Sequence, residues 1–252
     1  MTAPEVGLLL GAGFVAGVFN AVAGGGSLVS FPALLAVGYP SVTANVTNSI
    51  AIWPGYAGST VGYRSDLAGQ GRRVLSLGAT SAIGGLTGAV ILLNTPEKVF
   101  RGIVPWLVAF AAVLVAVQPR VAAAMQRLPG GSGEHRSALL HVGVFVGTIY
   151  AGYFGAGGGV LLLGILGLFL PGPVQELNAL RAALVLVVNT VTLVVFGLFG
   201  PVVWSAVGIM GGSSLVGGWT GAKVVRRLDA GILRATIVVF AGAVAVALFV
   251  RG

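Results

Sequence analysis

The stretch FNAVAGGGSLVSFP at residues 19–32 decides the fold, because three consecutive glycines interrupt an otherwise apolar segment. Each glycine inside a helix costs roughly 1 kcal/mol relative to alanine. A second stretch, AGYFGAGGGVLLLG at residues 151–164, repeats the interruption. Both stretches predict a break between helices, where backbone amides have no side chain in front of them.

The composition places the chain in a membrane. Hydrophobic residues make up 56% of the 252 residues and charged residues only 8%, whereas soluble domains are roughly one-quarter charged. The 42 glycines fit transmembrane helices that pack closely through small residues. The formal charge of +8 indicates loop orientation, so nucleic acid is not expected as a partner. We therefore expect an all-α, polytopic protein surrounded by the lipid bilayer.

Several classes of chemistry lack the residues they need. The chain has no cysteine and only two histidines, so disulfides, metal sites and cofactors are not expected. Its six carboxylates fall at segment ends or in loops, which disfavours a proton relay inside the membrane. No HExxH or Gly-x-Ser-x-Gly motif occurs, and GAGGGV lacks the Lys-Ser/Thr of a P-loop. We do not expect an enzyme.

Charged and Pro/Gly-rich positions divide the chain into ten apolar segments. Their approximate ranges are 6–23, 27–38, 43–62, 74–93, 98–117, 139–156, 160–171, 178–198, 202–222 and 231–250.

The ten segments form two copies of a five-segment unit. An offset of 133 to 135 residues brings Gly-Gly-Gly 24–26 onto 157–159 and IGGLTGA 83–89 onto VGGWTGA 216–222. A shared offset of this kind indicates an internal duplication. We predict a first repeat at 1–117, a cytoplasmic linker at 118–137 and a second repeat at 138–252.

Loop charges predict that the two repeats are inverted. YRSDLAGQGRR at 63–73 carries three arginines, but its counterpart at 198–201 carries no charge. The bias reverses between KVVRRLDAG at 223–231 and the nearly neutral NTPEK at 94–98. By the positive-inside rule, matching loops then face opposite sides of the membrane. Both termini are expected on the external side of the membrane and the linker on the cytoplasmic side.

Segments 27–38 and 160–171 have 12 residues each, about half of what a full span needs. We expect short, glycine-broken or re-entrant helices whose exposed amides and positive N-termini form two anion cradles. Broken helices of inverted repeats form transport sites near the membrane midplane in this way.

The chain resembles the TauE/SafE family of sulfite and organosulfonate exporters in GVFNAVAGGGSLVSFPALLAVG, ANVTNS, YFGAGGGVLL and ALRAALVLVVN. The resemblance extends over essentially the whole chain. It implies a bacterial inner-membrane carrier of a small sulfur-containing anion: sulfite, sulfoacetate, another organosulfonate or thiosulfate. Ala23 and Ala156 stand where other members often have isoleucine, and Val160 replaces Ser27 in the second repeat. The two cradles are therefore chemically unequal.

The candidate substrate-binding residues are the glycine triplets and the polar groups around them: Asn20, Gly24, Gly25, Gly26, Ser27, Asn45, Asn48, Gly157, Gly158, Gly159, Arg181 and Asn189. For Asn45 and Asn48 the alternative is hydrogen bonding between helices. For Arg181 it is snorkelling to the interface. Pro54 and Asn189 occupy matching positions and predict a kink or partial unwinding in each third segment. Arg101 and Trp106 are expected to be interface anchors.

These patterns favour export by alternating access at a midplane site between the two triplets. An inside-negative potential favours anion exit by roughly 2.3 kcal/mol per charge per 100 mV. The alternatives are a passive anion channel and an ion-coupled uptake permease for sulfonate or thiosulfate. Whether the chain forms a homodimer is left open.

Overall fold

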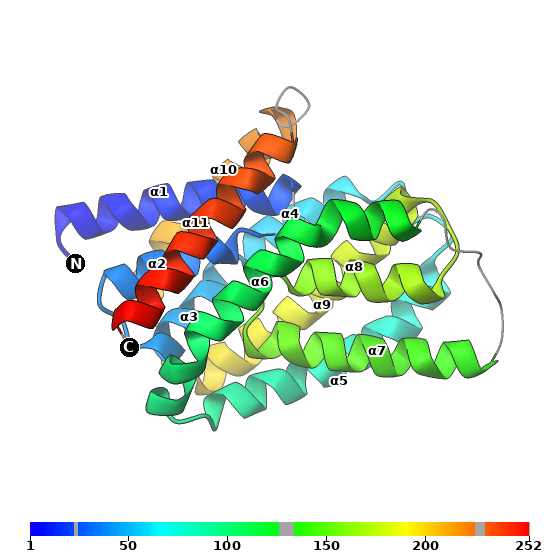
Figure 1. The fold of residues 1–252 in the computed structure, drawn as a ribbon, viewed down its shortest axis with the longest axis horizontal. Helices are drawn as coiled ribbons and strands as arrows, with labels where there is room; N and C mark the ends of the chain where they lie inside the picture. Colours follow the sequence, from blue (N-terminus) through cyan, green and yellow to red (C-terminus); the bar gives the residue numbers. More distant parts are fainter. Residues whose placement is uncertain (23–24, 126–133, 225–229, 252) are drawn as a thin grey trace.

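In the computed structural model, the described residues 1–22, 25–125, 134–224 and 230–251 form eleven helices and no strand (Figure 1). They are α1 (Ala3–Val22), α2 (Ser27–Ala36), α3 (Ser41–Ala51), α4 (Trp53–Gly62), α5 (Gly71–Leu93), α6 (Glu97–Met125), α7 (Glu134–Tyr153), α8 (Gly158–Phe169), α9 (Val174–Phe199), α10 (Trp204–Val224) and α11 (Ala230–Arg251).

The predicted segments correspond to these helices with two differences. Segment 43–62 contains both α3 and α4. Helix α6 runs eight residues beyond the predicted end of its segment, through Pro119 to Met125. Three consecutive alanines at 122–124 favour continuation of the helix, because alanine has the highest helix propensity. The expected linker at 118–137 is therefore helical at both of its ends.

The expected kinks at Pro54 and Asn189 differ in outcome. Helix α3 ends before Ile52 and α4 begins directly after it, with Pro54 in its first turn, because proline has no amide to donate to the preceding turn. Helix α9 runs unbroken through Asn189, so the partial unwinding expected there is wrong. Asn189 keeps its backbone amide, and its side-chain Nδ2 donates to Val185 O of the same helix at 2.8 Å.

Two short helices begin at the glycine triplets, α2 directly after the first triplet and α8 within the second. Helix α2 has 10 residues and α8 has 12, which correspond to about 15 and 18 Å at a rise of 1.5 Å per residue. Neither length reaches the ~30 Å of a hydrocarbon core. Between α7 and α8, Gly155 and Gly157 have φ of 82° and 74°, a left-handed conformation that glycine adopts without steric cost.

Glycines bring two helix pairs into backbone contact, and each pair joins one helix from either half of the chain. A Cβ on Gly17 of α1 would collide with Ser214 O of α10. A Cβ on Gly88 of α5 would collide with Ile149 O of α7. Small residues permit this approach in a membrane, where lipid supplies no hydrophobic force between helices. The pairs α1–α10 and α5–α7 are the most extensive helix contacts in the structure.

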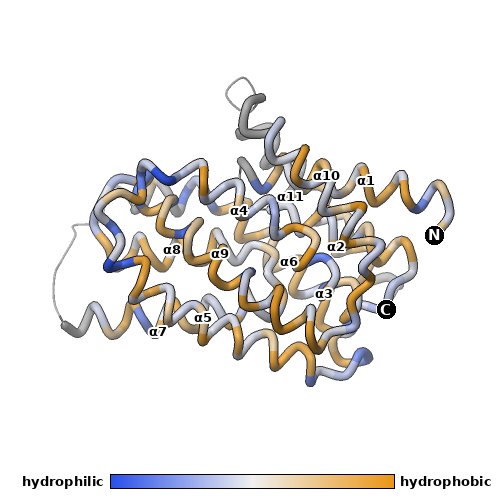
Figure 2. The backbone as a smooth tube through the Cα atoms, turned by 180° about the vertical axis from the view of Figure 1, so that it is seen from behind, coloured by the Kyte–Doolittle hydropathy of each residue, from blue (hydrophilic) through white to orange (hydrophobic). Residues whose placement is uncertain are grey.

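The helices have the lengths and surfaces of a multi-pass membrane protein. Among the described residues, four apolar helical stretches are long enough to cross a membrane: Ala3–Asn20, Gly71–Leu93, Glu97–Arg120 and Val174–Phe199. Hydrophobic residues dominate along the helices, and hydrophilic ones gather mainly near their ends (Figure 2). The two termini lie at one end of the molecule, and the last turn of α6 and the first turn of α7 lie at the opposite end (Figure 1).

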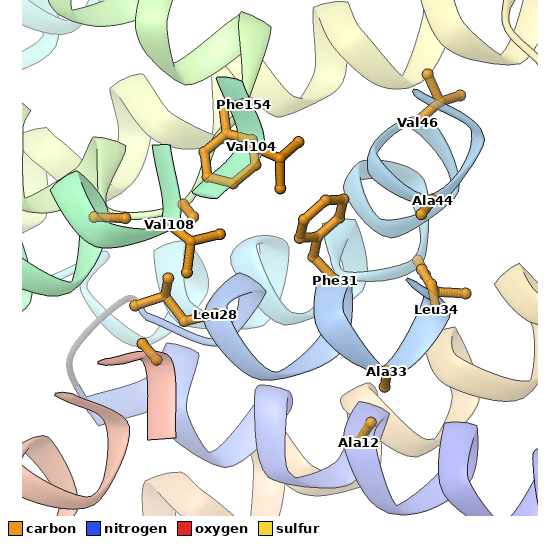
Figure 3. Close-up of a cluster of buried hydrophobic side chains, with 14 of the residues drawn as sticks. Ala12, Leu28, Phe31, Ala33, Leu34, Ala44, Val46, Val104, Val108 and Phe154 are labelled. Carbon is orange, nitrogen blue, oxygen red and sulfur yellow. The ribbon is translucent and has the colours of Figure 1, made fainter. Parts of the chain in front are cut away.

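The main buried cluster surrounds α2. Leu28, Phe31 and Leu34 of α2 are at most 1% exposed and pack with Val104 and Phe154 (Figure 3). The Phe31 and Phe154 rings meet edge to face, with centroids 5.4 Å apart. This cluster therefore fixes α2 against α6 and the junction between α7 and α8.

Candidate functional site

Asn20 connects the end of α1 to the start of α2. Its Oδ1 accepts a hydrogen bond from the Gly26 amide at 2.9 Å, and its Nδ2 is buried without a partner among the described residues. A Cβ on Gly26 would approach the Asn20 side chain and Ala16 O too closely. Only glycine therefore permits this contact, which satisfies one of the amides that a helix start leaves free.

Arg181 enters the same region from α9. The residue is only 8% exposed, and its Nε has no hydrogen-bond partner among the described residues. Among the described residues, the ionisable groups close to its charge are Tyr63, which directly follows α4, and Tyr56 of α4; no carboxylate is among them. A buried cation without a counter-ion is costly, so this guanidinium is the most distinctive electrostatic feature of the site.

A small cavity lies between these groups. It leaves about 20 Å³ for the centre of a water-sized sphere, enough for about one water molecule. Its lining residues come from α1, α4, α8 and α9: Asn20, Tyr56, Ser59, Gly159, Arg181, Ala182 and Val185.

The polar groups around the cavity are chiefly hydrogen-bond donors. A guanidinium and an amide NH₂ donate only, and a hydroxyl can donate. A Cβ on Gly159 would lie 3.5 Å from Arg181 Nη1, so the start of α8 lies against the guanidinium. The next two amides of α8, those of Val160 and Leu161, donate to Gly157 O, but that of Gly159 donates to no described residue. The arrangement suits a small anion, because charge, helix N-terminus and donors converge.

The cavity brings together three of the predicted residues, Asn20, Gly159 and Arg181. Gly26 and Ser27 are adjacent to it. Gly26 bonds to Asn20, and the Ser27 side chain interacts with the Tyr56 hydroxyl.

The other predicted residues lie elsewhere. Asn45 donates from Nδ2 to Tyr153 O at 2.9 Å, as the helix-packing alternative expects, although Asn45 Oδ1 and Asn48 Oδ1 are buried without described partners. Gly25 is buried and accepts a bond from the Leu28 amide. The remaining residues are a half-buried Asn189, Gly157 against Ala111, Gly158 against Ala151, and Gly24, which is outside the described residues.

Tyr56 and Ser59 line the cavity but were missed in the sequence. Together with Tyr63, the residue directly after α4, they are spaced by three and then four residues, the spacing of one helix face. A stripe of hydroxyl-bearing residues in an apolar helix was the signal that could have identified them. For metals, the described residues contain no group of three His, Cys, Asp or Glu side chains that could hold an ion.

Comparison with known proteins identifies the family of the chain. The family "Sulfite exporter TauE/SafE" matches residues 9–248. A "Probable membrane transporter protein" of Haemophilus influenzae is 24% identical over 92% of this chain and 89% of its own length. "Probable membrane transporter protein ORF9" of a Sinorhizobium species is 27% identical over 94% of this chain and 89% of its own length. "Probable membrane transporter protein YfcA" of Escherichia coli K12 is 27% identical over 88% of this chain and 80% of its own length. No solved structure matches significantly. Because the family match spans nearly the whole chain, the protein belongs to the TauE/SafE family of membrane transporters.

Proposed function

We propose that the chain exports a small sulfur-containing anion, such as sulfite, sulfoacetate or another organosulfonate, by alternating access at the cavity between the two triplets. The observation that carries the proposal is Arg181, a buried guanidinium facing Gly159 with no carboxylate among the groups that interact with it. Leaving a buried charge unpaired costs about 3–5 kcal/mol, and a bound oxyanion would offset this cost. The planar fork of arginine can give two hydrogen bonds to one oxyanion.

Inverted repeats are supported by how the helices exchange partners. Helix α1 packs against α10, and its counterpart α7 packs against α5, the counterpart of α10. Helices α6 and α11, the last of each repeat, pack against each other. An approximate two-fold relation between the repeats would produce this exchange, and it would place the site on the axis between them.

Alternating access requires a closed barrier on one side of the site, and α2 supplies one. Its first turn lies beside the cavity, and its last turn lines a hollow of about 630 Å³ at the end of the molecule that holds the termini. The two ends of α2 are about 14 Å apart. Between these two ends, the rings of Phe31 and Phe154 pack edge to face (Figure 3). We propose that they close the path from the cavity to the hollow.

The opposite barrier lacks these rings. At an offset of 133 residues, Gly164 corresponds to Phe31 and Ala21 corresponds to Phe154. We therefore propose Phe31 and Phe154 as the barrier on the side of the termini.

Purified protein tests the role of Arg181. We expect Arg181→Gln to weaken sulfite binding by about 10- to 100-fold, the equivalent of one charge-assisted hydrogen-bond interaction of 1.5–3 kcal/mol, and Arg181→Lys to retain part of it. Arg72→Gln, at an exposed position of α5, is the matched control. Equal affinity of wild type and Arg181→Gln at low salt would contradict the proposal.

Counterflow in proteoliposomes separates the mechanisms. A carrier accelerates uptake of labelled anion when unlabelled anion is present on the other side, whereas a passive channel does not. An ion-coupled uptake permease would instead depend on a sodium or proton gradient. We expect trans-stimulation without a cation gradient.

A further inference from the structure

The outer surface between α6 and α11 is hollowed along two connected stretches. The first hollow, of about 360 Å³, is lined by Lys98, Arg101, Trp106 and Phe249 among others. The second, of about 340 Å³, has small residues of both helices in its wall, including Ala112, Ala116 and Gly242. Phe249 lines both, so the two hollows form one furrow, which we call the α6–α11 furrow.

The furrow is polar at one end and apolar along the rest. Lys98 and Arg101 are exposed, and none of the described residues that line the first hollow is acidic. The neighbouring Glu97 accepts hydrogen bonds from the amides of Ser41 and Val42 at the start of α3. The charge of Glu97 is therefore compensated by a helix N-terminus. Lys98 and Arg101 can then interact with the negative charge of a bound ligand.

Aromatic rings mark the boundary between the two parts. Trp106 is 68% exposed and meets Phe249 edge to face, with centroids 4.9 Å apart. Tryptophan is enriched where the headgroup region meets the hydrocarbon. The charged end of the furrow thus has the residues of a membrane interface, and the small-residue part has those of the hydrocarbon region.

We propose that the α6–α11 furrow binds one anionic phospholipid, with its phosphate at Lys98 and Arg101 and an acyl chain beside Ala112, Ala116 and Gly242. Arg101 and Ala116 are 15 residues apart, which corresponds to about 22 Å of helix. One leaflet with its headgroups is about 20–22 Å thick, half of the ~40–45 Å bilayer. The positive charge at one end of the furrow and the length of the furrow therefore both fit an anionic phospholipid. This site is separate from the Arg181 cavity, and the proposal stands without the proposed function.

Native mass spectrometry of the detergent-purified chain tests the charged end. Phosphatidylglycerol and phosphatidylcholine with identical chains are titrated separately. We expect wild type to prefer phosphatidylglycerol, and Lys98→Gln/Arg101→Gln to lose that preference by roughly 30-fold, since each cation near a membrane surface contributes about 1 kcal/mol. Arg72→Gln/Arg73→Gln removes two exposed charges at the start of α5 and should leave the preference unchanged. Equal binding of both lipids to wild type, or an equal loss in the control, would overturn the proposal.

A second variant tests the apolar part. A Cβ on Gly242 would meet open space, so Gly242→Phe should fold and fill the furrow. We expect this variant to bind both phosphatidylglycerol and phosphatidylcholine more weakly than wild type does. Inorganic phosphate should not displace phosphatidylglycerol; full displacement would mean an anion site without a lipid tail. If Gly242→Phe instead disrupts a cross-linkable dimer and leaves lipid binding intact, the furrow is an interface between two copies and the lipid assignment is wrong.

Discussion

Replacing Gly159 by alanine separates substrate binding from folding. In the structure, the added Cβ would lie 3.5 Å from Arg181 Nη1 and 3.8 Å from Val185 Cγ2. Both are ordinary van der Waals distances, so no backbone or side chain has to move. The methyl group would nevertheless enter a cavity with only about 20 Å³ for the centre of a water-sized sphere. An oxyanion oxygen and the methyl group cannot both occupy that space.

The expected effects on binding and stability have opposite signs. Loss of a charge-assisted hydrogen bond costs about 1.5–3 kcal/mol, which weakens anion binding by about 10- to 100-fold. Replacing glycine by alanine at a compatible position stabilises the fold by about 0.4–1 kcal/mol. The variant should therefore unfold at the same or a slightly higher temperature than wild type while binding the anion poorly.

Calorimetric titration with sulfite and thermal unfolding of the purified protein measure both quantities. Gly58→Ala is the matched control, because Gly58 lies on an exposed face of α4 with open space around it. It should gain similar stability and bind sulfite normally. Wild-type affinity in Gly159→Ala would refute the placement of the anion at the start of α8. A lower unfolding temperature would refute the claim that the methyl group fits.

Three further predictions follow from the fold. Single cysteines at Ser65 and Gly200, in this cysteine-free chain, should react with an impermeant thiol reagent from opposite sides of the membrane; labelling from one side would contradict inverted repeats. Phe31→Leu removes a ring contact worth about 0.5–1.5 kcal/mol, so counterflow should accelerate while sulfite affinity stays constant, and unchanged counterflow would exclude Phe31 from the barrier. Gly88→Leu should abolish folded protein in a detergent gel-filtration assay, whereas Gly62→Leu, facing open space, should not; equal yields would refute the close α5–α7 contact.

The helices could be predicted from the sequence because each has a local cause. Apolar segments of about 20 residues, separated by charges, glycines and prolines, are sufficient to locate α1, α5, α9 and α10 to within a few residues. The break before α4 also has a local cause in Pro54. At Asn189 the same reasoning failed, since an asparagine keeps its backbone amide and can place its side-chain bond on its own helix.

The cavity depends on contacts that no local pattern encodes. Arg181 was recognised as an intramembrane cation, and its proximity to Gly159 follows from how α8 packs on α9. Tyr56 and Ser59 join them because α4 turns back toward α9 after the break at Ile52. Asn45 has the same chemistry as Asn20 but faces Tyr153 O instead of the cavity. The sequence identified polar side chains in apolar segments, but tertiary packing determines which of these side chains line the cavity.

The contact between α1 and α10 also has a consequence for how the protein is made. The surface of α1 around Gly17 fits backbone atoms of α10, yet Gly217 of α10 is synthesised 200 residues after Gly17. At about 5–20 residues per second, α1 leaves the ribosome about 10–40 s before its partner exists. During this interval its glycine face contacts lipid or insertion machinery. Assembly of the first half therefore depends on the second, and separately expressed halves should accumulate only when they are produced together.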